Sequence, residues 1–211
     1  MKTNDLIAAL AADTTPALPQ SRALRYAVAG AVLAAAIAFF IILEPRPDFV
    51  QAIHTVRFDF KFVVTLTLAN CAFAGLKRAM RPEMAGRPYT YLLLVAPAML
   101  LVAVLAEFAA VPSALWVTRW FGRNWLYCMM FIPILSLAPL AILIAVLRRG
   151  ATTAPVRTGA LAGLLAGAIG AVFYAAHCPD DSPFFVASWY AIAIGAVTIL
   201  GAFAGRRMLR W

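Results

Sequence analysis

VRTGALAGLLAGAIGAVFYAA, residues Val156–Ala176, is a run of 21 residues that carries a single charge, on Arg157. Crossing the hydrocarbon core of a bilayer takes about 20 apolar residues in an α-helix. The run has that length, and it lacks the alternation of apolar and polar residues that marks a strand of a membrane β-barrel. This stretch therefore predicts a membrane-spanning helix.

The rest of the chain repeats this pattern. Hydrophobic residues make up 64% of the 211 residues and charged residues 13%, against about 45–50% and about 25% in soluble proteins. The candidate spans are Tyr26–Leu43, Phe62–Met80, Tyr89–Phe108, Trp125–Leu147, Val156–Ala176 and Phe184–Gly205. We therefore predict an all-α membrane protein, a bundle of six transmembrane helices.

The basic residues predict the direction of the spans, because Lys and Arg collect in cytoplasmic connections. With the N-terminus inside, 13 of the 18 Lys and Arg residues fall on the cytoplasmic side, and five fall outside, among them Lys61. We expect both termini in the cytoplasm. The net charge of +9 then orients helices in a bilayer, and no direct contact with nucleic acid is predicted.

Two cysteines come to one level of the predicted bundle. Cys178 follows the fifth span at the outer face, and Cys128 lies three residues into the fourth span, which starts there. Three interpretations stay open: unrelated thiols, a disulfide in an oxidising periplasm, or a pair that binds soft metal or responds to oxidants. Cys71 lies deeper and is interpreted as a small buried hydrophobe.

Cys178 belongs to the connection HCPDDSP, His177–Pro183, which contains no basic Lys or Arg. His177 can bind metal when its imidazole is neutral, or lower the pKa of the thiol when it is protonated. Asp180 and Asp181 attract cations, so His177, Asp180 and Asp181 are candidate metal ligands. The favoured interpretation of the two aspartates is structural: they end and start the flanking helices.

The interiors of the predicted spans contain few charged side chains, and Glu107 lies at the outer end of its helix. Transporters usually carry such groups in mid-helix, facing a path. No hydrolase triad or phosphate-binding glycine loop is present, so we expect neither an enzyme nor a cofactor. The alternatives considered are a membrane thiol oxidoreductase, which would want a CxxC or second thiol pair, and a small metal transporter.

Two further patterns concern packing. Gly159, Gly163 and Gly167 form a GxxxGxxxG row in the fifth span, for which we favour close packing inside the bundle over a dimer face. Trp116 and Trp120, in the connection PSALWVTRWFGRNW, are spaced for a short interfacial helix, although a simple aromatic belt is the favoured interpretation.

The first residues, MKTNDLIAALAADTTPALPQSR, predict a short cytoplasmic helix followed by a linker. Leu6, Ile7 and Leu10 fall on one face of that helix. A helix of about ten residues is too short to be stable alone in water. It is interpreted as a helix lying on the membrane, a disordered tail, or a peptide that folds into the groove of a partner.

The chain resembles the NrsF-type membrane anti-sigma factors over essentially its full length. The resemblance rests on six spans and on four segments: MKTNDLIAALAAD (residues 1–13), LRRGA (Leu147–Ala151), HCPDDSPFFVASWY (His177–Tyr190) and GRRMLRW (Gly205–Trp211). The opening segment and the His-Cys-Pro stretch are specific, whereas the glycine rows are not.

The resemblance implies a multi-pass protein of the bacterial inner membrane that holds an extracytoplasmic-function (ECF) sigma factor away from RNA polymerase. Release under heavy-metal or redox stress would depend on two cysteines, which match Cys128 and Cys178. Residues 1–25 would be the sigma-binding segment, with the face of Leu6, Ile7 and Leu10 as its docking surface. Residues 26–211 would be a six-helix sensor domain. The implied partners are the sigma factor, the lipid bilayer and heavy-metal ions.

Overall fold

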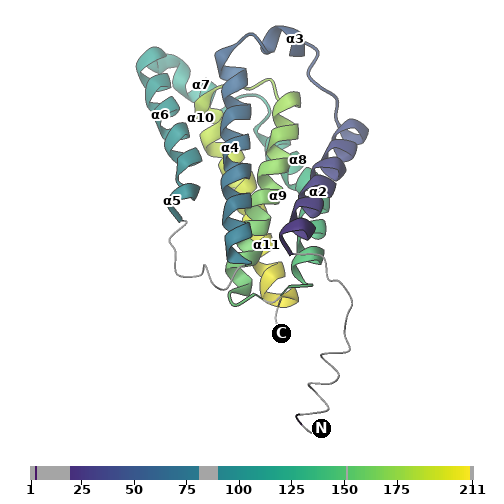
Figure 1. The fold of residues 1–211 in the computed structure, drawn as a ribbon. Helices are drawn as coiled ribbons and strands as arrows, with labels where there is room; N and C mark the ends of the chain where they lie inside the picture. Colours follow the sequence, from purple (N-terminus) through teal and green to yellow (C-terminus); the bar gives the residue numbers. More distant parts are fainter. Residues whose placement is uncertain (1–2, 4–19, 81–89, 151, 210–211) are drawn as a thin grey trace.

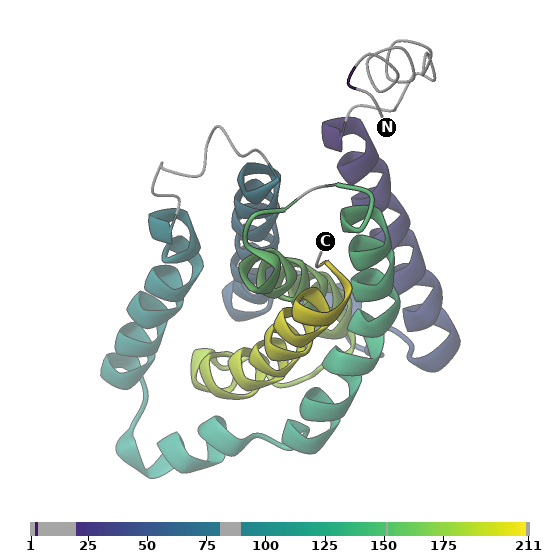
Figure 2. The ribbon, with the colours of Figure 1, turned by 90° about the horizontal axis from the view of Figure 1, so that it is seen from below.

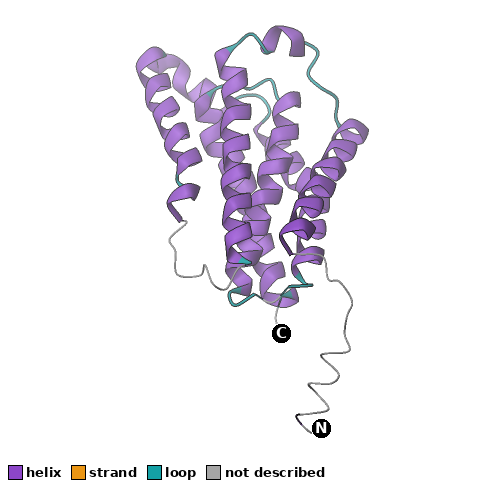
Figure 3. Cartoon of the chain, viewed as in Figure 1, coloured by secondary structure: helices purple, strands orange, loops and turns teal. Residues whose placement is uncertain are grey.

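The computed structural model describes residue 3 and residues 20–80, 90–150 and 152–209. Within these ranges all regular structure is helical (Figures 1 and 3). The predicted N-terminal helix, with Leu6, Ile7 and Leu10, lies outside the described residues.

The long helices reproduce the predicted spans. They are α2 (Gln20–Ile42), α4 (Val56–Ala79), α5 (Thr90–Leu93) continued by α6 (Val95–Ala110), α8 (Trp125–Leu147), α9 (Pro155–His177) and α11 (Ala191–Met208). Short elements lie between them: α3 (Phe49–Ala52), a 3₁₀ turn (Ser113–Leu115), α7 (Trp116–Phe121), α10 (Pro183–Phe185) and a π-helical turn (Val186–Tyr190). Six helical stretches in the described part are long and apolar enough to cross a membrane.

One predicted boundary is wrong in a way that matters for the site. Helix α4 begins at Val56, well before the predicted Phe62, so Lys61 lies inside a helix and not in a connection. The Lys61 side chain is 0% exposed. The cause is an ion pair that keeps this ammonium group inside the protein, described below.

Helix α9 lies at the centre of the bundle, between α2, α4, α8 and α11 (Figure 2). Its sequence suits that place, because alanine and glycine side chains let neighbouring helices come close on several sides. Helix α6 is the least buried of the six and packs mainly against α4.

Three glycines of α9, Gly159, Gly163 and Gly167, face α11. A methyl group on Gly163 would lie 2.5 Å from the Val197 carbonyl oxygen, and one on Gly159 would meet the backbone of Gly201 and Gly205. Distances that short leave no room for a side chain. The glycine row therefore packs inside the bundle, as predicted.

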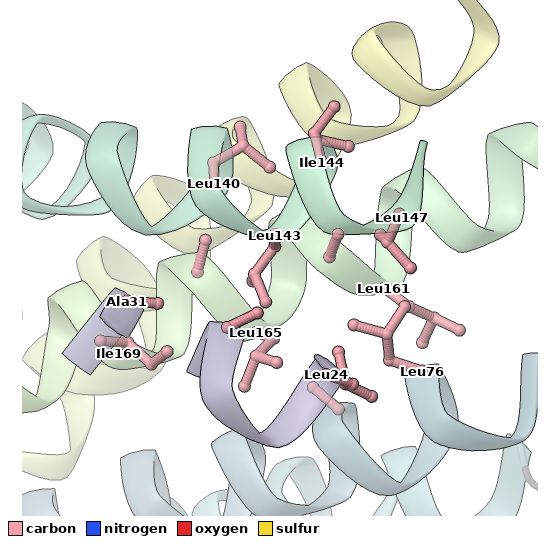
Figure 4. Close-up of a cluster of buried hydrophobic side chains, with 14 of the residues drawn as sticks. Leu24, Ala31, Leu76, Leu140, Leu143, Ile144, Leu147, Leu161, Leu165 and Ile169 are labelled. Atoms are coloured by element: carbon pink, nitrogen blue, oxygen red, sulfur yellow. The ribbon is translucent and has the colours of Figure 1, made fainter. Parts of the chain in front are cut away.

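Aliphatic side chains close the bundle near the end where α2 starts and α11 finishes, which we call the terminal end. One buried cluster joins α2, α4, α8 and α9; it includes Leu24, Leu76, Leu140, Leu143, Leu147, Leu161 and Leu165 (Figure 4). The opposite end, called the far end, carries α3, α7 and α10 (Figure 1). There the short helix that the sequence offered as the less favoured interpretation is present as α7, and Trp116 packs edge-on against Phe108, with ring centroids 4.8 Å apart.

Candidate functional site at the far end of the bundle

Cys128 and Cys178 lie in one buried cluster at the far end. Cys128 occupies the first turn of α8, and Cys178 is the residue that follows α9. Both are 0% exposed, and both thiols are free. The cysteine cluster also contains Phe39, Leu43, Ile132, Tyr174, Phe185 and Tyr190. The structure thus brings together two thiols that the sequence placed at the same level, whereas Cys71 lies on α4, partly exposed.

Two tyrosines of this cluster were not predicted as site residues. The rings of Tyr174 and Tyr190 lie 5.9 Å apart, and both side chains are buried. Neither hydroxyl makes a hydrogen bond of good geometry in the described part of the chain, but both lie close to the Cys178 thiol. Tyr190 ends the π-helical turn, a local widening of a helix that often occurs at functional sites.

Burial raises the pKa of the Cys178 thiol to about 11. The nearby Lys61 ammonium group opposes this change, but burial dominates. The thiol is therefore protonated at neutral pH, and a protonated thiol is a weaker nucleophile and metal ligand than a thiolate.

Asp181 is held by two buried cations, and we call these three residues the Asp181 ion cluster. The Lys61 ammonium nitrogen lies 2.5 Å from one carboxylate oxygen of Asp181, and the Arg46 guanidinium lies 2.9 Å from the other. Both cations also lie near the ring of Phe58, at 5.2 Å for Lys61 and 5.6 Å for Arg46. The carboxylate of Asp181 and the ring of Phe58 explain how the charged Lys61 side chain is accommodated away from solvent.

The second face of Arg46 reaches solvent. It donates two hydrogen bonds of 2.6 Å to Asp48, whose side chain is 55% exposed. These hydrogen bonds lower the pKa of Asp48 and raise that of Arg46. Arg46 therefore connects the exposed carboxylate of Asp48 with the partly buried one of Asp181.

Glu107 forms a separate ionic centre. It is buried at the end of α6 and accepts hydrogen bonds from Arg57 at 2.9 Å and from Arg119 at 2.8 Å. The Ser182 hydroxyl lies 3.4 Å away. Glu107 thus joins helices α4, α6 and α7 at the far end. From the sequence, only its position at the outer end of a helix could be predicted.

Asp180 is hydrogen-bonded to the turn that precedes α8. Its carboxylate accepts hydrogen bonds from the backbone N–H of Arg123 and Asn124, at 3.2 and 3.0 Å, where α8 begins. Gly122 precedes them with φ of 59°, and a methyl group there would lie 2.8 Å from Asp180 and 2.7 Å from Phe185. A carboxylate suits a helix N-terminus because that end carries partial positive charge. The sequence favoured a role for the aspartates at the two helices that flank the connection, whereas Asp180 contacts the backbone that precedes α8.

The three candidate metal ligands thus have separate contacts. The Nδ1 atom of His177 lies 2.6 Å from the Glu44 carbonyl oxygen, Asp180 binds the start of α8, and Asp181 binds Arg46 and Lys61. No group of three or more His, Cys, Asp and Glu side chains is placed to hold a metal ion within the residues that the structure describes. Metal binding by these three residues stays a prediction.

Comparisons with known proteins agree on one family. A family model described as "Negative regulator of sigma F" (NrsF) matches residues 10–211. The chain is 34% identical over 216 residues to "Anti-sigma-F factor NrsF" of Caulobacter vibrioides, with all of both chains covered. It is 32% identical over 222 residues to "Probable anti-sigma-F factor NrsF" of Azospira oryzae, again over both full lengths. No solved structure matches the chain significantly.

Proposed function

Because the chain belongs to the NrsF family of negative regulators of sigma F, we propose that it is a membrane anti-sigma factor that sequesters an ECF-type sigma factor. The observation that carries this proposal is the full-length match to two proteins named as anti-sigma-F factors. A regulator of this kind needs a site that binds protein and a site that receives a signal, and it needs no catalytic group.

We place the protein in the bacterial inner membrane with both ends of the chain in the cytoplasm. The six long apolar helices support insertion. The distribution of charge supports the orientation, since basic side chains gather at the terminal end of the bundle. They are Arg22, Arg25, Lys77, Arg78, Arg148, Arg149, Arg157, Arg206 and Arg207. The far end, with both cysteines, then faces the periplasm.

The sigma factor would bind residues 1–25, and the apolar face of Leu6, Ile7 and Leu10 would dock in one of its grooves. A short amphipathic helix gains stability when its apolar face is buried in a partner. The predicted linker connects this docking surface to α2, so a movement of α2 would displace the point at which the segment is attached.

Cys128 and Cys178 would receive the signal, either a heavy-metal ion or an oxidant. Their burial in one cluster supports a joint role, because a change at either sulfur must disturb the same packed side chains. To release the sigma factor, the signal has to favour a second arrangement of the bundle by a few kcal/mol.

The docking proposal predicts that Leu6→Asp together with Leu10→Asp abolishes capture of the sigma factor. Two carboxylates in an apolar groove would be desolvated without partners, and a loss of at least about 100-fold in affinity is expected. The measurement is the amount of sigma factor that co-purifies with the tagged chain from solubilised membranes. Ala8→Asp, on the opposite face of the predicted helix, is the matched control and should retain capture. Equal sigma yields from the double variant and wild type would refute the docking surface.

A further inference from the structure

The connection that follows α2 is bonded to the end of α9. The backbone N–H of Arg46 donates to the Ala176 carbonyl oxygen at 3.1 Å, and His177 lies 2.6 Å from the carbonyl oxygen of Glu44. The Arg46 side chain adds its ion pair with Asp181. Backbone and side-chain contacts of the connection after α2 therefore hold the far end of α2 to the segment that carries Cys178.

The two cations of the Asp181 ion cluster also form hydrogen bonds with the backbone of Cys178 itself. Lys61 donates to the Cys178 carbonyl oxygen at 2.8 Å, and Arg46 approaches the same oxygen at 3.5 Å. Lys61 belongs to α4, whereas Arg46 belongs to the connection after α2. Two cations from different parts of the bundle thus converge on the peptide group of one cysteine.

Helix α2, with Leu43 directly after its end, also contributes side chains to the cysteine cluster. Phe39 and Leu43 belong to the cysteine cluster, and α2 packs along α8, which carries Cys128. Helix α2 packs against both α8 and α9, the helices next to the two cysteines. It is also the described helix that follows the N-terminal residues in the chain (Figure 1). The contacts therefore offer a physical route from the thiols to the segment that precedes α2.

We propose that the Asp181 ion cluster is a latch that couples the state of Cys178 to the position of α2, with Arg46 as the coupling residue. The inference rests on the proposed function, because α2 matters to signalling only if the segment before it binds a partner. With the latch closed, α2 is held against α9 and the protein is in its resting state. With the latch open, the far end of α2 is free to move.

Burial of the thiol explains why a signal would open the latch. Cys178 is 0% exposed, so a group added to its sulfur has no empty space to enter. The 178–182 connection contains no regular helix, and it can be displaced more easily than α8 or α9. Its displacement would pull the Cys178 carbonyl and Asp181 away from both cations.

The latch is expected to be either closed or open, with little between. A partly opened cluster would leave the Lys61 ammonium buried without a full set of partners, which is unfavourable. Coupling of distant sites requires an element with two such discrete arrangements. This property distinguishes the cluster from the exposed ion pair of Arg46 with Asp48.

The latch can be tested without any sigma factor. Arg46→Gln removes the charge that faces Asp181, and Asp48→Asn, the matched control, removes only the exposed partner of Arg46. Full-length variants in lipid nanodiscs are compared by hydrogen–deuterium exchange and mass spectrometry. Arg46→Gln should accelerate exchange on the order of tenfold both in residues 176–182 and in the outer half of α2. Asp48→Asn should match wild type.

Acceleration confined to residues 176–182 would show that the latch does not reach α2, and unchanged exchange in both segments would show that no latch exists. Either result overturns the inference. Should Arg46→Gln not fold, Arg46→Lys is measured in its place. Its single ammonium group cannot bond both Asp48 and Asp181 as the guanidinium does, so faster exchange in the same two segments is expected.

A reporter experiment in cells tests whether the latch affects release of the sigma factor. In cells that carry a sigma-dependent reporter, Arg46→Gln should raise unstressed expression several-fold and Asp48→Asn should not. If the Arg46→Gln variant shows faster exchange in α2 but the same unstressed reporter expression as wild type, the link between the latch and release of the sigma factor is refuted. Capture of a sigma factor by the wild-type chain is measured alongside. A failure of that capture would reject the proposed function, while the exchange experiment would still decide whether the latch exists.

Discussion

Asp181→Asn is expected to lower the free energy of unfolding by about 3–5 kcal/mol, as is usual when one partner of a buried ion pair is removed. Asp181 provides the negative charge between Arg46 and Lys61, whose side chains are 9% and 0% exposed. Asparagine can accept a hydrogen bond but carries no charge. Two cations would then be left facing each other in a buried site.

The measurement is unfolding of the purified full-length protein in detergent, followed by heat or denaturant at neutral pH. Lys61→Met is the informative comparison, because it leaves the pair of Arg46 and Asp181 intact and places an apolar side chain of similar length in the core. Its cost should be below about 1.5 kcal/mol. A cost for Asp181→Asn no larger than that for Lys61→Met would contradict the assigned role of the carboxylate.

Cys128→Ser together with Cys178→Ser is expected to abolish stress-dependent release while resting capture of the sigma factor persists. Serine is close to cysteine in size, but it forms no disulfide and is a poor ligand for soft metals. The measurement is expression from a sigma-dependent promoter, with and without a soft divalent metal and, separately, an oxidant. Cys71→Ser is the matched control and should respond like wild type. Normal induction in the double variant would remove the cysteines from the signalling role.

The single variants refine this prediction. If the two thiols act as one unit, either single serine variant should lose as much induction as the double variant, because the effects of coupled residues do not add. Independent thiols would give partial and additive losses. The buried position of both thiols in one cluster favours the first outcome.

The six long apolar helices of the described residues could be predicted from the sequence because the length of an apolar run depends on local composition alone. The packing of the glycine row could also be predicted, since small residues spaced by four share one helix face. The start of α4 could not. Hydropathy places the helix start after the last charge, whereas Lys61 is kept inside α4 by Asp181, a partner that lies far away along the chain.

The candidate site was predicted only in part. Cys128 and Cys178 were placed at one level from the direction of their helices, and the structure brings them into one cluster. The surrounding groups depend on contacts between distant segments, which no local pattern contains. Tyr190 reaches the cluster through a π-helical turn, and Glu107 gains two arginine partners from α4 and α7.

A sigma factor that is held away from RNA polymerase has to be bound to this chain and not to the core of the polymerase. The most direct test is affinity purification of the full-length protein from the solubilised membranes of its own bacterium, with mass spectrometry of the bound proteins. We expect an ECF-type sigma factor in near-equal amount to the chain, without the core subunits of RNA polymerase. Recovery of no sigma factor, or of a sigma factor together with the core subunits, would contradict the proposed function.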